Sequence, residues 1–135
     1  MIRYLLDTNA LIELIRDGRS PVGIRARQHT VEEIGIPVLG LHELYFGAFK
    51  SSRVEESVSA VEDLIFPVVP FEREDARCAG EIRAVLRRAG LQIGHYDVLI
   101  AGQALARGLV MVTHHVRKFG RVEGLRVEDW QGEAG

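Results

Sequence analysis

Residues 2–9 read IRYLLDTN, an apolar run that ends abruptly at Asp7. The run Ile2–Leu6 predicts a short buried strand, because apart from Arg3 and Tyr4 it lacks polar alternation. A carboxylate directly after a buried strand is costly unless it is hydrogen-bonded, paired or bound to a cation. Asp7 is therefore either the cap of the helix that follows or a functional residue.

Strand-like and helical segments alternate along the rest of the chain. Further strands are expected at 34–38, 67–70, 109–112 and 125–127, helices at 10–16, 22–31, 41–49, 53–65, 74–89 and 97–106, and a loop at 113–120. Thr8 or Asn9 is expected to cap the first helix. This alternation predicts an α/β fold with a mostly parallel sheet covered on both faces, in which ligands bind beyond the carboxyl ends of the strands. With no repeat or linker, residues 1–135 are expected to form a single domain.

The composition excludes several classes of protein. The 135 residues carry 17 basic and 19 acidic side chains, a net charge of −2, which argues against a bulk electrostatic nucleic-acid binder. Cys78 is the single cysteine, so an internal disulfide and a cysteine-rich zinc cluster are excluded, and a buried structural thiol in a reducing compartment is expected. The first apolar run is too short for a signal-peptide core or a membrane span, so we expect a cytoplasmic protein without a membrane segment.

Three carboxylates stand beside apolar segments far apart in the sequence. They are Asp7, Glu43 within an apolar helical segment, and Asp97 at the start of another. Either aspartate alone could be a helix cap, and Glu43 could be a surface residue. Taken together, they indicate a site for Mg²⁺, or for Mn²⁺, because hard divalent cations prefer oxygen ligands. Thr8, Asn9 and Thr113 could orient the ligands or bind substrate through hydroxyl and amide groups.

Four motifs, in the same order and at similar spacing, resemble those of PIN-domain ribonucleases, especially the VapC-type toxins of bacterial toxin–antitoxin pairs. They are Leu5–Asn9, His42–Gly47, Ile93–Ala101, and Val112–Phe119 followed by Val122–Leu125 and Trp130. The first motif alone is weak, but the four together cover the chain from residue 1 to about residue 130.

This resemblance implies an α/β/α sandwich and a Mg²⁺- or Mn²⁺-dependent endoribonuclease. It also implies a cognate antitoxin that blocks the site, and a homodimer or larger toxin–antitoxin assembly. It assigns metal ligation and catalysis to Asp7, Glu43 and Asp97, and a supporting role to Asn9 and Thr113.

The chain departs from the family pattern after Thr113. His114 stands where an asparagine is usual, and His115 stands at the fourth acidic or amide position. In a polar loop, a histidine pair is commonly solvated. At this location His115 could bind a softer ion such as Mn²⁺, and either imidazole could bind phosphate when protonated. Neither supplies the missing negative charge, so the sequence does not decide whether one or two metal ions bind.

Other charged residues give weaker signals. Arg117 and Lys118 could hold RNA phosphates or belong to a solvated loop. Arg83, Arg87 and Arg88 are interpreted as a solvated or partner-facing surface. Glu13 and Asp17 are interpreted as solvated.

The hypothesis that the sequence favours is metal-assisted hydrolysis of RNA phosphodiester bonds. The alternative is a catalytically weak or inactive module that binds RNA or an antitoxin without cleavage, since His115 replaces an acid. A phosphatase of the haloacid-dehalogenase type also begins with a strand and an aspartate. That chemistry requires a second aspartate at position 9, which is asparagine here.

Overall fold

The computed structural model describes residues 1–131 and has a parallel five-stranded sheet at its centre. The strands lie in the order β3–β2–β1–β4–β5, and every neighbouring pair is parallel. Their bounds are β1 Tyr4–Leu6, β2 Ile34–Pro37, β3 Val68–Val69, β4 Val110–Val112 and β5 Arg126–Glu128. The predicted parallel sheet is therefore confirmed. The last four residues of the expected single domain, 132–135, lie outside the described residues.

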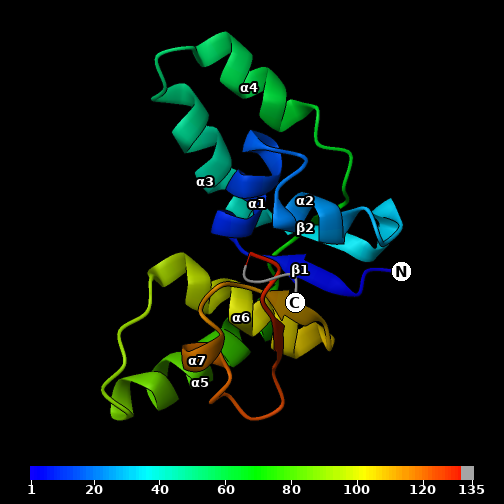
Figure 1. The fold of residues 1–135 in the computed structure, drawn as a ribbon. Helices are drawn as coiled ribbons and strands as arrows, with labels where there is room; N and C mark the ends of the chain where they lie inside the picture. The colour runs from blue at the N-terminus through cyan, green and yellow to red at the C-terminus, as the bar shows by residue number, and fades with distance from the viewer. Residues whose placement is uncertain (132–135) are drawn as a thin grey trace.

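Helices cover both faces of this sheet, as Figure 1 shows, with α1–α4 on one side and α5–α7 on the other. Their bounds are α1 Thr8–Arg16, α2 Pro21–Ala26, α3 Val38–Phe49, α4 Val54–Glu62, α5 Arg73–Arg88, α6 His95–Arg107 and α7 Val116–Phe119, with a 3-10 turn at Val31–Glu33. This is the expected α/β/α sandwich. In residues 1–131, no helix is long and apolar enough to cross a membrane.

Strand β1 divides the hydrophobic core in two. Tyr4 and Leu6 pack into the cluster under α1–α4, while Leu5 packs into the cluster under α5–α7. Successive side chains of a strand point to opposite faces, so a strand with helices on both sides needs apolar residues at every position. The burial of β1 explains why IRYLL lacks alternation.

Several predicted boundaries or elements differ from the structure. Asp7, and not Thr8 or Asn9, caps α1, since Asp7 Oδ1 accepts a hydrogen bond from the N–H of Ala10. The helix expected at 22–31 ends at Ala26, because Thr30 begins a separate 3-10 turn that it caps. The loop expected at 113–120 contains the short helix α7, which is anchored by the fully buried Phe119.

Helices α5 and α6 pack at unusually short range. A Cβ atom placed on Gly102 of α6 would lie 2.5 Å from the Cα of Ala79 on α5. Real Cβ atoms do not approach other carbons this closely, so glycine is required here for the two helices to meet. This contact sets the distance between α5 and α6, the helix whose first turn carries Asp97.

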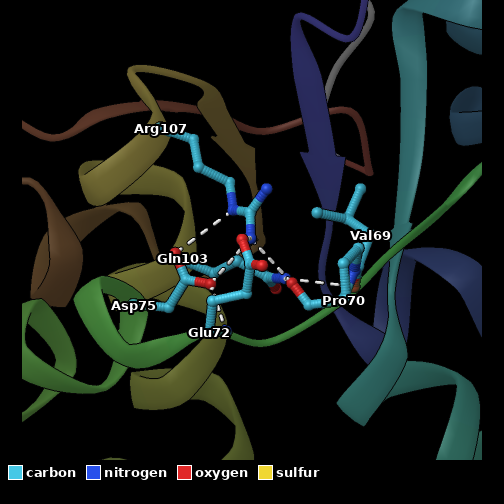
Figure 2. A network of polar contacts seen from close by, with 6 residues as sticks. All are labelled: Val69, Pro70, Glu72, Asp75, Gln103 and Arg107. Carbon is cyan, nitrogen blue, oxygen red and sulfur yellow. Dashed lines mark hydrogen bonds and ion pairs between the residues drawn. The ribbon is translucent and has the colours of Figure 1, made fainter.

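A polar network ties the same two helices to the end of β3 (Figure 2). Arg107 on α6 donates to both carboxylate oxygens of Asp75 on α5, at 3.2 and 2.9 Å, and to Glu72 Oε1 at 3.0 Å. The Gln103 amide donates to the carbonyl oxygens of Val69 and Pro70. Asp75 and Gln103 are buried, so these bonds replace water for the Asp75 carboxylate and the Gln103 NH₂ group, whereas Gln103 Oε1 is buried without a hydrogen-bond partner.

Candidate active site

The carboxyl ends of the three adjacent strands β1, β4 and β5 place three polar residues side by side. Asp7 follows β1 and its N–H donates to the carbonyl of Val112, the last residue of β4. Thr113 follows β4 and its N–H donates to the carbonyl of Glu128, the last residue of β5. Asp129 comes next after β5. These backbone bonds fix the strand ends, so the side chains that follow them lie at one edge of the sheet.

Asp7 is completely buried, and its two oxygens have different environments. Oδ1 caps α1 through the Ala10 N–H at 2.9 Å, whereas Oδ2 is buried without a hydrogen-bond partner. Burial raises the pKa of Asp7, while the Ala10 N–H and the Thr113 hydroxyl act in the opposite direction. The capping role therefore accounts for one oxygen only, and the other remains available to a cation.

Asp97 lies in the first turn of α6, but Gly94, and not Asp97, is the N-cap. Burial, and after it the negative charge of Asp7, raise the pKa of Asp97 from 3.8 to about 6. The charge of Glu43 acts in the same direction, and His115 and Lys118 oppose it. Asp7 and Glu43, the other two carboxylates predicted from sequence, are therefore both close enough to Asp97 to disfavour its charge.

Glu43 reaches this site from α3. Its Oε1 accepts a hydrogen bond of 2.5 Å from the hydroxyl of Thr8, the first residue of α1. Glu43 also lines a hollow of about 420 Å³ together with Thr8, Asn9, His95 and Asp97. Glu43 is half-buried at a crevice and is not a freely solvated surface residue.

The donor chemistry of this crevice fits a hard divalent cation. In the arrangement seen for residues 1–131, no three acidic, histidine or cysteine side chains converge closely enough to hold one metal ion. The unpartnered oxygen of Asp7, and the repulsion that Asp97 experiences from Asp7 and Glu43, are nevertheless what a bound cation would relieve.

The residues after β4 surround the same carboxylates. The Thr113 hydroxyl is buried and accepts from the N–H of His115, whose Nε2 lies 4.0 Å from Asp97 Oδ2. The neighbouring His114 is exposed and its Nδ1 lies 3.0 Å from Asp129 Oδ2. His115 thus lines the site, whereas His114 contacts Asp129 at its border.

The remaining predicted residues lie farther out. Asn9 is exposed at the edge of the crevice. Lys118 Nζ donates to the carbonyl of Gln92, and its charge still lowers the pKa of Asp97. Arg117 lies exposed on α7. The structure therefore brings Lys118 near the carboxylates but shows no contact between Arg117 and them among residues 1–131.

Sequence reasoning missed two acidic residues near the site. Glu13 was expected to be solvated, which is wrong: its Oε2 is buried without a hydrogen-bond partner, and it lines a hollow with Asn9 and His115. The four-residue spacing from Asn9 to Glu13, which places both on one helix face, is the signal that could have identified it. Asp129 was not singled out, although its charge contributes to the raised pKa of Asp7. Its position directly after a strand was the available signal.

Comparisons with known proteins agree with this geometry. The family model described as PIN domain matches residues 4–125. A curated protein of Salmonella typhimurium named tRNA(fMet)-specific endonuclease VapC is 40% identical over 133 residues, covering 96% of this chain and 99% of that protein. Ribonuclease VapC2 of Haemophilus influenzae is 34% identical with the same coverage. A crystal structure of DNA-bound VapBC from Salmonella typhimurium has a chain that superposes with a TM-score of 0.87 and 39% identity, over 96% of this chain and 99% of that one.

Proposed function

This chain belongs to the PIN-domain family, and we propose that it is a Mg²⁺-dependent endoribonuclease, the toxin of a VapBC-type toxin–antitoxin pair. The observation that carries the proposal is the convergence of three carboxylates from three parts of the fold: Glu43 and Asp97 line one crevice, and the buried Asp7 follows β1 close enough to Asp97 to raise its pKa. Crowded carboxylates of this kind are unfavourable in the empty protein and become favourable when a cation binds.

In this proposal Asp7, Glu43 and Asp97 hold Mg²⁺, with Mn²⁺ as a substitute. When bound, the ion supplies Lewis-acid chemistry for phosphodiester hydrolysis. Thr8 orients Glu43 through its hydroxyl, and Thr113 fixes the backbone of His115. His115 can hold a proton at Nε2 beside Asp97 and, when charged, attract a phosphate. The burial of Asp7 excludes water from its side of the site.

For the substrate, we propose the initiator tRNA as the first RNA to test. Two relatives, 40% and 38% identical to this chain over almost their whole length, are named tRNA(fMet)-specific endonucleases. A net charge of −2 does not favour binding nucleic acid through bulk charge, so recognition would have to use local features around the crevice.

For the partner, we propose a cognate antitoxin that blocks the crevice. Similar chains have been crystallised in complexes named VapBC, from Salmonella typhimurium and from Rickettsia felis. A cationic antitoxin side chain placed among the carboxylates would relieve the same repulsion as a metal ion. Assembly as a homodimer, or as a larger toxin–antitoxin complex in the cytoplasm, belongs to the same proposal.

Expression in cells, with and without the product of the adjacent gene, tests this function. We expect growth arrest and RNA ends at one or a few positions when the chain is expressed alone, and neither when both genes are expressed. An Asp97→Asn variant provides the control for site-dependent cleavage. Stable RNA binding without new RNA ends would instead favour the non-cleaving module.

A further inference from the structure

A second hollow lies on the face of the molecule covered by α5 and α6. It has a volume of about 380 Å³ and is lined by the C-terminal half of α5, the segment 91–95 and the first turn of α6. We define the anion pocket as this hollow, with Arg83, Arg87 and His95 as its polar wall and Leu86, Leu91 and Val98 as its apolar wall. Its size suits a small organic ligand or one unit of a polymer.

The charge of the anion pocket is positive and uncompensated. Its lining contains two arginines and a histidine but no carboxylate. Among residues 1–131, neither Arg83 nor Arg87 forms an ion pair, whereas Arg77 on the same helix pairs with Glu74 at 2.7 Å. Guanidinium groups left free beside a hollow are well suited to bind a phosphate through two parallel hydrogen bonds.

Helix stability accounts for only part of this arrangement. Basic residues in the last turn of a helix interact favourably with its dipole, which explains Arg87 and Arg88 at the end of α5. Arg83 lies one turn earlier, outside that last turn, and four residues from Arg87 on the same helix face. The sequence-based interpretation of these arginines as a solvated or partner-facing surface did not include the hollow that two of them line.

The apolar wall of the pocket gives it a second chemical character. Leu86 and Val98 are buried, and Leu91 is half-buried beside them. Leu86 and Val98 form the buried floor of the pocket. The half-buried Leu91 and Ile93 offer apolar contact to the face of a base, while the arginines offer contact to its phosphate. A nucleotide that is not stacked in a duplex presents both groups at once.

The anion pocket borders the carboxylate crevice at His95. His95 lines both hollows, and Asp97 follows it by two residues on the same helix turn. The segment that forms the pocket wall is held from the other side, since Lys118 Nζ donates to the carbonyl of Gln92. A chain of nucleotides could therefore pass from the carboxylates over His95 to Arg83 and Arg87.

We propose that the anion pocket binds an unpaired nucleotide of the RNA substrate, next to the scissile phosphodiester bond. Its phosphate contacts Arg83 and Arg87, and its base lies on Leu91 and Ile93. This inference rests on the proposed function, because it assumes RNA in the crevice. It adds a subsite that positions the RNA without taking part in the chemistry.

RNA binding by a cleavage-deficient parent tests the subsite. In an Asp7→Asn background, the double variant Arg83→Gln/Arg87→Gln is compared with Arg73→Gln by fluorescence anisotropy with labelled initiator tRNA. Arg73 is the matched control, because it is exposed at the other end of α5, about 21 Å from Arg87 at 1.5 Å per residue. Circular dichroism and gel filtration of each variant check the fold and the oligomeric state.

We expect the double variant to bind RNA at least about tenfold more weakly than the parent. The slope of log affinity against log salt concentration should become shallower by about one to two. Arg73→Gln should leave both unchanged. In the active protein, the double variant should raise KM and leave kcat and the Mg²⁺ dependence unchanged. Equal RNA binding by parent and double variant would overturn the subsite, as would a changed oligomeric state with unchanged affinity. A parent that binds no RNA at all would instead count against the proposed function.

Discussion

Replacing Asp97 by asparagine should abolish activity and yet stabilise the metal-free protein. The change keeps the size of the side chain and removes a negative charge that burial disfavours most, with Asp7 and Glu43 adding to the effect. A mutation that damages the fold would lower activity and stability together. Opposite signs for the two effects are therefore a specific signature of carboxylates crowded at a cation site.

The size of the stabilisation follows from the pKa of Asp97. A rise from 3.8 to about 6 corresponds to about 3 kcal/mol of cost for holding the charge in the folded protein at pH 7. The side chain is 20% exposed, so solvent screening should reduce the measured gain to about 2 kcal/mol.

The sign of the pH dependence can be stated in advance. The pKa of Asp97 is higher in the folded than in the unfolded protein. Its carboxyl group therefore costs no stability below about pH 4, where it is protonated in both states, and the free energy of unfolding falls as the pH rises through about 6. The asparagine variant has no ionisable group at this position and does not lose this stability. Its advantage over the wild type should therefore be absent near pH 4 and complete above pH 7.

Urea unfolding in EDTA at several pH values measures this difference. Adding Mg²⁺ at one hundred times its Kd should return about 2.7 kcal/mol to the wild type and less to the variant, which lacks a ligand charge. An asparagine variant that is no more stable than the wild type at pH 7.5, or whose advantage is independent of pH, would refute the reasoning.

Three further perturbations have distinct expected outcomes. Asp75→Ala leaves the Arg107 guanidinium without its buried partner and should cost about 3 kcal/mol in urea unfolding; a loss below about 1 kcal/mol would show that the network in Figure 2 contributes little. Gly102→Ala forces a Cβ against α5 and should cost about 3 kcal/mol of stability. Gly80→Ala places its Cβ in open space on the same helix pair and should stabilise by up to about 1 kcal/mol. Equal thermal midpoints for the two variants would disprove the close packing. His115→Asp adds a negative charge beside Asp97, so cleavage should require less Mg²⁺ and the metal-free protein should unfold more readily; unchanged metal titrations would place His115 outside the ligand set.

The sheet and the order of its elements could be predicted from the sequence, because they depend on local patterns. Buried parallel strands such as Tyr4–Leu6 have consecutive apolar residues. Long amphipathic helices such as α5 show three- and four-residue spacing. Short elements were predicted less well. The four-residue helix α7 depends on the burial of Phe119 in the tertiary structure, and no local pattern in a polar loop specifies that contact.

The candidate site shows a similar division. Asp7, Glu43 and Asp97 could be singled out because each interrupts or borders an apolar segment, where a charge is costly. Glu13 also has apolar neighbours, Ile12 and Leu14, but a lone charge in an amphipathic helix is usually on its solvated face, so this argument did not single it out. Asp129 follows Glu128 and a weak last strand, so it does not interrupt an apolar segment. Their relation to the site depends on how α1 and the end of β5 lie beside the carboxylates.

The anion pocket marks the limit of sequence reasoning on this chain. Arginines in the last turns of a helix have the same pattern whether they face open solvent or line a hollow. The segment that closes the hollow, 91–95, comes from outside the helix. Only the tertiary structure shows that Arg83 and Arg87 share a wall with His95.

Cleavage of initiator tRNA by the purified protein, followed over a Mg²⁺ titration, tests the central claim most directly. Wild type and an Asp7→Asn variant are compared at equal concentration, each with Mg²⁺ and with EDTA. The account predicts cut RNA only for the wild type with Mg²⁺, at a rate that saturates with the ion. Cleavage that persists in EDTA, or in the Asp7→Asn variant at the wild-type rate, would contradict it.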